Sequence, residues 1–276
     1  MKFFKILSDI LPLIKNKKQR LCYAAIRLKN KIKEFFFKRS DNKFLFILSP
    51  PFCGSTLLNQ LISTSSSVSV NNPYGNREGQ NLPEIKKIFY PDTRWKEEID
   101  LDWKYIKKTW MKYWDLTKPI LLEKSPPNII RAEAIKKAFS PHYFIIFYRN
   151  PYAHCESLMR RNNYSAAFSA ELVIRYLTYQ KYNIEKLDNV LNLSYEELTE
   201  NIDNSIKKIA NFLPELKDIK RDNKFTAHNY KAKSLNIENL NIEKINKLTA
   251  SQIQEINIIF IQDNDLLNFF GYKLIN

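Results

Sequence analysis

The chain has few residues of the kinds that form cross-links or bind metal ions. Its 276 residues include three cysteines and three histidines. The cysteines, Cys22, Cys53 and Cys155, are widely spaced and form no CxxC pair, so they predict no disulfide framework and are typical of a reducing compartment. The cysteines and histidines show no metal-ligand spacing. We therefore expect a cytoplasmic protein without a metal site.

Long apolar runs are also missing. No stretch approaches the roughly 20 apolar residues that a membrane-spanning helix requires. The segment Phe3–Ile14 is interrupted by Lys5, Asp9 and Pro12, and no small-residue cleavage site follows it, so we expect no secretory signal. Apolar and aromatic residues nevertheless make up 44% of the chain, which argues against disorder and allows one large α/β domain.

Acidic residues are scarce in the first 43 residues, which hold thirteen Lys and Arg against three Asp and Glu, whereas the whole chain has a net charge of +15. Within this segment an apolar stripe recurs at helical spacing: Leu21, Ala25, Leu28, Ile32 and Phe35. It predicts a basic amphipathic helix. The helix either docks on the domain with a solvated cationic face, which we favour, or lies on an anionic membrane surface. We assign 1–42 to this extension and 43–276 to the α/β domain.

A first anion site is predicted where an apolar strand turns into a helix. The strand Phe44–Leu48 ends before Pro50 and Pro51, and small residues then open the helix. Such a helix N-terminus presents free N–H groups and the positive end of a helix dipole to an anion. The residues expected around the anion are Cys53, Gly54, Ser55, Thr56 and Leu57.

A second anion site is predicted farther along the chain. The strand Tyr143–Tyr148 delivers Arg149 to its C-terminal end, and Asn150 can cap a helix that begins at Pro151. Ser157 lies on that helix. Two such sites on neighbouring strands suit a ligand with two separate phosphate-like groups.

Together the two sites resemble the cofactor motifs of sulfotransferases that use 3′-phosphoadenosine 5′-phosphosulfate (PAPS). In that family a Pro-Arg-Ser-Gly-Thr-Thr-like loop holds the 5′-phosphosulfate, and residues 51–56 stand in its place. An Arg-x-Pro followed by a Ser holds the 3′-phosphate, and Arg149, Pro151 and Ser157 match its spacing. Where the family has an Arg or Lys before the Ser-Gly pair, this chain has the neutral residue Phe52. The resemblance implies an α/β fold with a P-loop-like parallel sheet flanked by helices on both faces.

The resemblance also implies the catalytic residues. The segment 123–126 is similar to a Glu-Lys-Thr-Pro segment whose Lys lies beside the transferred group, so Lys124 is expected to stabilise charge on the leaving oxygen. The segment 76–83 is similar to the one that carries the general base, which makes Glu78 the candidate. Glu84 and His228 are the alternatives.

Two further cofactor contacts follow from the same resemblance. Tyr195 stands where the family has a Tyr near the nucleotide, and it opens the segment Tyr-Glu-Glu-Leu. Lys231 falls where the family closes a basic loop over the 3′-phosphate, and Lys233 is equally placed.

Two other kinds of phosphate loop fit the first anion site less well. A nucleotide triphosphatase P-loop needs a Lys before its Ser or Thr, and none precedes Ser55; Arg149 also stands where a metal-binding Asp would be expected. A Cys phosphatase would pair Cys53 with an Arg at the position that Asn59 occupies. Neither signature is complete.

We therefore predict a PAPS-dependent sulfotransferase that transfers a sulfuryl group to a hydroxyl or amine of an unidentified acceptor: a glycan, lipid, peptide or small molecule. The nucleotide and the acceptor are the expected partners, an anionic membrane is a further one through the N-terminal helix, and no nucleic acid is expected. A nucleotide-dependent kinase that needs Mg²⁺ remains an alternative. So does a non-catalytic basic protein that binds a membrane or another polyanion.

Overall fold

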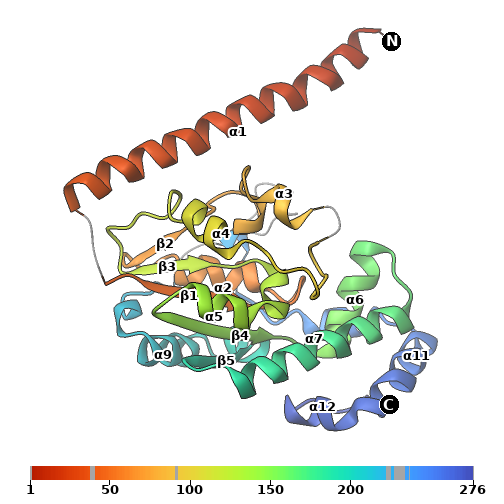
Figure 1. Ribbon diagram of the computed structural model, residues 1–276. Helices are drawn as coiled ribbons and strands as arrows, with labels where there is room; N and C mark the ends of the chain where they lie inside the picture. Colours follow the sequence, from red (N-terminus) through yellow and green to blue (C-terminus); the bar gives the residue numbers. More distant parts are fainter. Residues whose placement is uncertain are drawn as a thin grey trace.

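The computed structural model describes residues 2–37, 41–90, 93–221, 225–226, 234–235 and 237–275, and for 2–18, 225–226 and 234–235 it describes the backbone alone. A parallel sheet with the strand order β2-β3-β1-β4-β5 lies at its centre (Figure 1). Its strands are β1 (Lys43–Leu48), β2 (Val68–Val70), β3 (Ile120–Glu123), β4 (His142–Tyr148) and β5 (Val190–Ser194). Because the strands are parallel, their carboxyl ends open on one edge, where parallel sheets bind ligands.

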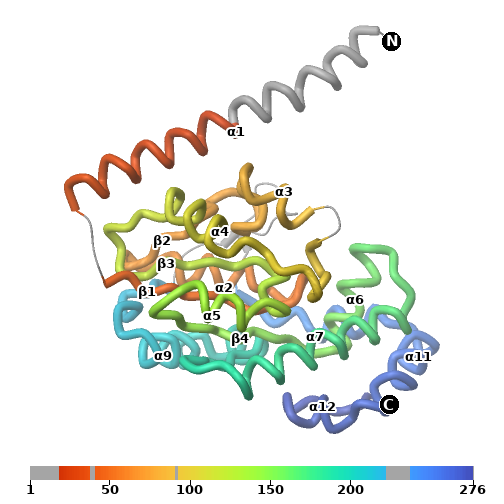
Figure 2. Tube along the Cα trace, viewed as in Figure 1, coloured from red at the N-terminus to blue at the C-terminus, as the bar shows by residue number. Residues whose placement is uncertain are grey.

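Helices and short 3₁₀ segments connect the strands and surround the sheet (Figure 2). Those before β5 are α1 (Lys2–Phe37), α2 (Ser55–Ile62), η1 (Gly79–Asn81), α3 (Lys86–Phe89), α4 (Trp103–Trp110), η2 (Pro126–Ile130), α5 (Ala132–Ala138), α6 (Pro151–Asn162) and α7 (Ala166–Lys186). The later elements are α8 (Tyr195–Glu200), α9 (Ile202–Phe212), η3 (Pro214–Leu216), the hairpin of β6 (Phe225–Thr226) and β7 (Ser234–Leu235), α10 (Asn241–Ile245), α11 (Ala250–Phe260), η4 (Ile261–Asp263) and α12 (Asn264–Phe269).

Both faces of the sheet are covered. Phe44 and Phe46 of β1 pack in one buried cluster with side chains of α4 and α5, whereas Leu45 and Ile47 pack in another with α2 and α9. Alternate residues of a strand point to opposite faces, so a doubly covered strand is apolar at every position. A third buried cluster joins α6, α7, α11 and α12. The predicted α/β fold, with a parallel sheet covered on both faces, is confirmed.

The N-terminal helix α1 is confirmed, but its orientation differs from the expected docking. It lies on the side of the domain that carries α3 and α4 (Figure 1). Buried Tyr23 and half-buried polar residues contact the domain, while the apolar stripe points away from it and is exposed. The stripe is displaced because Arg27 and Asn30 bond to Glu84 and to the carbonyl of Tyr113. Within the described part of the chain, no helix has the length and hydropathy to cross a membrane.

Candidate active site

The first anion site is a tight turn between β1 and α2. Gly54 caps α2 with a φ of 90°, a left-handed conformation that glycine adopts at little cost. A Cβ atom on Gly54 would lie 2.7 Å from Cδ2 of Tyr195, so there is no space for a side chain. The turn therefore requires Gly54 both for its backbone angle and for its contact with Tyr195.

The N-terminus of α2 supplies the donors of the first anion site. The first N–H groups of a helix have no acceptor within the helix, and here they belong to Ser55 and Thr56. Leu57, which we also expected to contact the anion, differs, because its N–H donates to the carbonyl of Gly54 at 2.9 Å. An anion bound at the predicted first site would therefore meet the amides and the hydroxyl groups of Ser55 and Thr56.

Cys53 is buried inside the turn beside His154. Nε2 of His154 lies 2.8 Å from the carbonyl oxygen of Pro51, and Nδ1 lies 3.6 Å from Sγ of Cys53. Burial lowers the pKa of His154 to about 3, so the neutral ring donates its Nε2–H to Pro51. Burial also raises the pKa of the Cys53 thiol, which stays protonated at neutral pH. Cys53 thus shapes the turn and lacks the thiolate of a nucleophile.

Lys124 reaches the first anion site from the end of β3. Its Nζ donates to Oγ1 of Thr56 at 3.3 Å and forms an ion pair of 3.3 Å with Oε1 of Glu78. Only 2% of the Lys124 side chain and 7% of the Glu78 side chain are exposed. Burial lowers the pKa of Lys124, while the Glu78 carboxylate opposes that effect. The structure therefore brings together both residues that were predicted to be catalytic.

The second oxygen of Glu78 is held by its own loop. Oε2 accepts hydrogen bonds from the amide groups of Gln80 at 2.5 Å and Asn81 at 3.1 Å. The backbone carbonyl of Glu78 accepts a hydrogen bond of 2.7 Å from Nδ2 of Asn72. These contacts hold the loop in place and fix the carboxylate of Glu78 beside Lys124.

Glu123, the last residue of β3, holds the loop that contains Glu78 against the sheet. Its carboxylate accepts hydrogen bonds from the N–H of Gly79 at 2.9 Å and from Oγ of Ser125 at 2.5 Å, and it also bonds to Asn128. A Cβ atom on Gly79 would lie 2.8 Å from Oε1 of Glu123. Burial raises the pKa of Glu123 to about 7. Glu123 therefore positions the residue after Glu78, and its own oxygens are enclosed.

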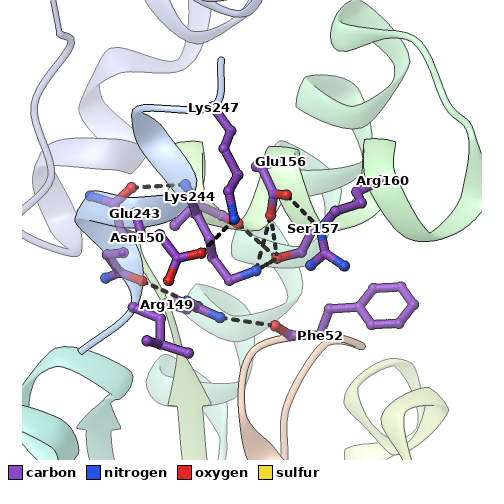
Figure 3. A network of polar contacts seen from close by, with 12 residues as sticks. Phe52, Arg149, Asn150, Glu156, Ser157, Arg160, Glu243, Lys244 and Lys247 are labelled. Carbon is purple, nitrogen blue, oxygen red and sulfur yellow. Dashed lines mark hydrogen bonds and ion pairs between the residues drawn. The ribbon is translucent and has the colours of Figure 1, made fainter. Parts of the chain in front are cut away.

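Arg149 follows β4 directly, at the predicted second anion site, and extends toward the carbonyl of Phe52 (Figure 3). Its Nε donates to Oδ1 of Asn241 at 2.6 Å, its Nη1 donates to the carbonyl of Phe52 at 3.4 Å, and its guanidinium carbon lies 4.0 Å from the centre of the Tyr195 ring. Buried Nη2 has no hydrogen-bond partner among the residues that the structure describes. A buried donor without a partner is costly, so this nitrogen is available to an anionic ligand.

Ser157 lies on α6, whose N-terminus is capped by Asn150 as predicted. Its Oγ accepts a hydrogen bond of 2.7 Å from Nζ of Lys244, which also pairs with Oε2 of Glu156 at 2.9 Å (Figure 3). Burial lowers the pKa of Lys244 to about 8, against the opposing effect of Glu156. The sequence interpretation missed Lys244, because α10 carries no family motif.

Phe52 is uncharged, so it cannot supply the cation that the family has at the first anion site. Its φ of 67° is left-handed, its carbonyl contacts Arg149, and its ring points away from Arg149 (Figure 3). A cation reaches α2 from another segment, since Nη1 of Arg77 lies 3.5 Å from Oδ1 of Asn59. Burial lowers the pKa of Arg77. The sequence interpretation overlooked Arg77, although it immediately precedes Glu78.

The predicted site residues thus form two adjacent groups at the carboxyl edge of the sheet. Tyr195 joins them, because its ring contacts the position of Gly54 on one side and Arg149 on the other. Lys231, Lys233 and His228 lie outside the described residues. Among the residues that are described, no group of three or more His, Cys, Asp or Glu side chains could hold a metal ion.

Known proteins share this fold. The model of the Sulfotransferase family matches residues 45–217. The chain is similar to the sulfotransferase domain of the olefin synthase of Synechococcus PCC 7002, with 18% identity, a TM-score of 0.52 and coverage of 87% of this chain and 98% of the other. A sulfotransferase from Alicyclobacillus acidocaldarius has 14% identity and a TM-score of 0.52, over 86% and 97% of the two chains. No curated protein matches the sequence.

Proposed function

The chain belongs to the sulfotransferase family, which makes it a sulfuryl-transferring enzyme with a sulfonate donor and an acceptor, and we propose that its donor is PAPS. The observation that carries this choice is the second anion site. Arg149 has a buried nitrogen without a partner among the described residues, and Ser157 and Lys244 lie in the same network. A donor with a 3′-phosphate would supply the acceptor oxygen that this nitrogen of Arg149 lacks, beside the ammonium group of Lys244.

The residues of the two sites fit the two ends of PAPS. We assign the 5′-phosphosulfate to the turn at Gly54 and the amides of Ser55 and Thr56. The 3′-phosphate is assigned to Arg149, Ser157 and Lys244. Charge-assisted hydrogen bonds from Arg and Lys to phosphate are among the strongest polar contacts that a protein makes.

Glu78 and Lys124 have complementary roles in this proposal. The acceptor oxygen or nitrogen attacks sulfur while the bond from sulfur to the 5′-phosphate oxygen breaks. Glu78 takes the acceptor's proton, and Lys124 stabilises the negative charge that develops on the leaving oxygen. Their ion pair of 3.3 Å keeps both groups oriented before the substrates bind. Adenosine 3′,5′-bisphosphate is the released nucleotide.

Arg77 is our candidate for the cation that Phe52 lacks. Its guanidinium contacts Asn59 on α2, and its neighbour Glu78 pairs with Lys124. We therefore assign Arg77 as a second positive charge for the group that Lys124 serves. We also propose that the enzyme acts in the cytoplasm, because Cys22, Cys53 and Cys155 are all free.

Calorimetric titration with nucleotides tests the proposed donor. Adenosine 3′,5′-bisphosphate is expected to bind without Mg²⁺ and more tightly than 5′-AMP, because it engages both anion sites. Equal affinities for these two nucleotides would contradict the 3′-phosphate assignment. Tighter binding of ATP with Mg²⁺ would instead favour phosphoryl transfer.

A further inference from the structure

The exposed face of α1 carries the apolar stripe. Leu28 is 62% exposed, Ile32 is 52% exposed and Phe35 is 84% exposed. Phe36 extends this apolar surface at the C-terminal end of the helix. Contiguous apolar surface of this kind is unusual on a soluble domain and marks a site of interaction.

The opposite face of α1 is already occupied by the domain. Tyr23 is 3% exposed, and its hydroxyl donates to Oδ1 of Asn72 at 3.1 Å. Arg27 pairs with Glu84 at 2.6 Å, and Lys33 pairs with Asp115. The domain therefore holds the helix by its polar side, and the stripe cannot turn inward without breaking these contacts.

Cations line the apolar stripe. Arg20, Lys29 and Lys31 are all exposed, and at 3.6 residues per turn Lys29 lies on one side of the stripe and Arg20 and Lys31 lie on the other. Within 19–37 the acidic residue is Glu34, which is half-buried on the docked side. A stripe of apolar side chains between two rows of cations matches the interface between the headgroups and the acyl chains of an anionic bilayer.

We propose that α1 binds the surface of an anionic lipid membrane through this stripe. The apolar side chains enter the headgroup region while Lys29, Lys31 and Arg20 pair with lipid phosphates. A second copy of the chain suits the stripe less well, because it would bring two segments with an excess of positive charge together. The helix lies along the surface, and it needs no membrane-spanning segment to do so.

Membrane binding would bring the candidate base close to the lipid. The ring of Tyr23 packs against that of Tyr74 at 5.3 Å, and Asn72, which accepts from Tyr23, holds the backbone of Glu78. About one helix diameter, roughly 10 Å, then separates this segment from the membrane surface. This consequence rests on the proposed function, whereas the binding itself does not.

Flotation of the full chain with vesicles tests the proposal. We expect binding to phosphatidylcholine vesicles that contain phosphatidylglycerol, weaker binding to phosphatidylcholine alone, and loss of binding at high salt. The double substitution L28E/I32E is expected to weaken binding about tenfold or more, because it removes two apolar contacts and adds two negative charges. The matched control is I258E/I261E, which changes two exposed isoleucines that are 62% and 64% accessible on a different face.

Several results would overturn the proposal. One is failure of the wild-type chain to bind anionic vesicles, and another is equal weakening by both double substitutions. A third is a change of oligomeric state in L28E/I32E, measured by sedimentation velocity, without a change in vesicle binding. Circular dichroism melting checks that both variants fold. Nucleotide titration is measured separately, so failure of the proposed donor site and failure of membrane binding remain distinguishable.

Discussion

The two anion sites are built in different ways. The first consists of one continuous turn, whose donors are backbone N–H groups of α2 and whose shape depends on Gly54. The second is assembled from side chains on three separate elements, with Arg149 after β4, Ser157 on α6 and Lys244 on α10. A site made by local backbone is visible as a motif, whereas one made by distant side chains is complete only when the chain has folded.

The two sites are also expected to have different roles, the first in catalysis and the second in binding of the donor. Lys124 and Glu78 meet beside the first site, so substitutions there should change the rate of transfer. Arg149 and Lys244 are proposed to meet only the 3′-phosphate end of the donor, so substitutions there should change affinity. Four experiments can sharpen or break this division.

The largest effect is expected from Lys124→Ala. Loss of one preorganised group that stabilises transition-state charge typically costs about 10²–10³-fold in rate. Since Phe52 is neutral, we expect the upper end of that range, with the affinity for adenosine 3′,5′-bisphosphate within a few-fold of wild type. Single-turnover release of this nucleotide from PAPS measures the rate. Lys118→Ala is the control, because half-buried Lys118 lies before the opposite end of β3 and donates to the carbonyl of Ser66. Near-normal turnover in Lys124→Ala would remove it from the chemistry.

Arg149→Ala should lower the affinity for adenosine 3′,5′-bisphosphate about 100-fold, because a buried charge-assisted contact is lost. The affinity for 5′-AMP should change little, since that nucleotide has no 3′-phosphate. Titration calorimetry with both nucleotides measures the difference. Arg160→Ala is the matched control, because Arg160 pairs with Glu156 in the same network and is more exposed. Equal losses for the two nucleotides would contradict the separation of the sites.

The fold was predictable because its signals are local. β1 and β4 are short apolar runs, and the Asn150 cap with Pro151 marks the start of α6. Lys244 was not predictable in the same way, since it lies far along the chain from Arg149 on a helix of five residues. The family resemblance pointed to Lys231, which lies outside the described residues and stays a prediction.

The orientation of α1 was also missed, for a physical reason. The apolar stripe was expected to face the domain, as it does in most amphipathic helices. Here Tyr23 and Arg27 find specific partners in Asn72 and Glu84, and these contacts select the opposite face. Sequence periodicity defines the two faces of a helix but not which of them the domain binds.

Arg77→Ala tests whether a second cation serves the first anion site. We expect turnover to fall about tenfold, less than for Lys124→Ala, because Arg77 is partly solvated and solvent screens its charge. Single-turnover measurement of the double substitution F52R/R77A provides a rescue, since it restores a cation where the family has one. Rescue would assign Arg77 to the sulfuryl group, and failure of Arg77→Ala to slow turnover would exclude it.

The last effect, and the most specific, is expected from pH. Lys244 has a pKa of about 8, so it is mostly charged below that pH and loses its proton above it. A phosphate prefers the charged amine, so the affinity for adenosine 3′,5′-bisphosphate should fall as pH rises through about 8. Lys244→Met should bind about tenfold more weakly at neutral pH and lose this dependence. Lys247→Met, which removes an exposed cation of the same segment, should keep it. Titrations across this pH range decide the matter, because an unchanged profile in Lys244→Met would show that the second anion site ends at Arg149 and Ser157.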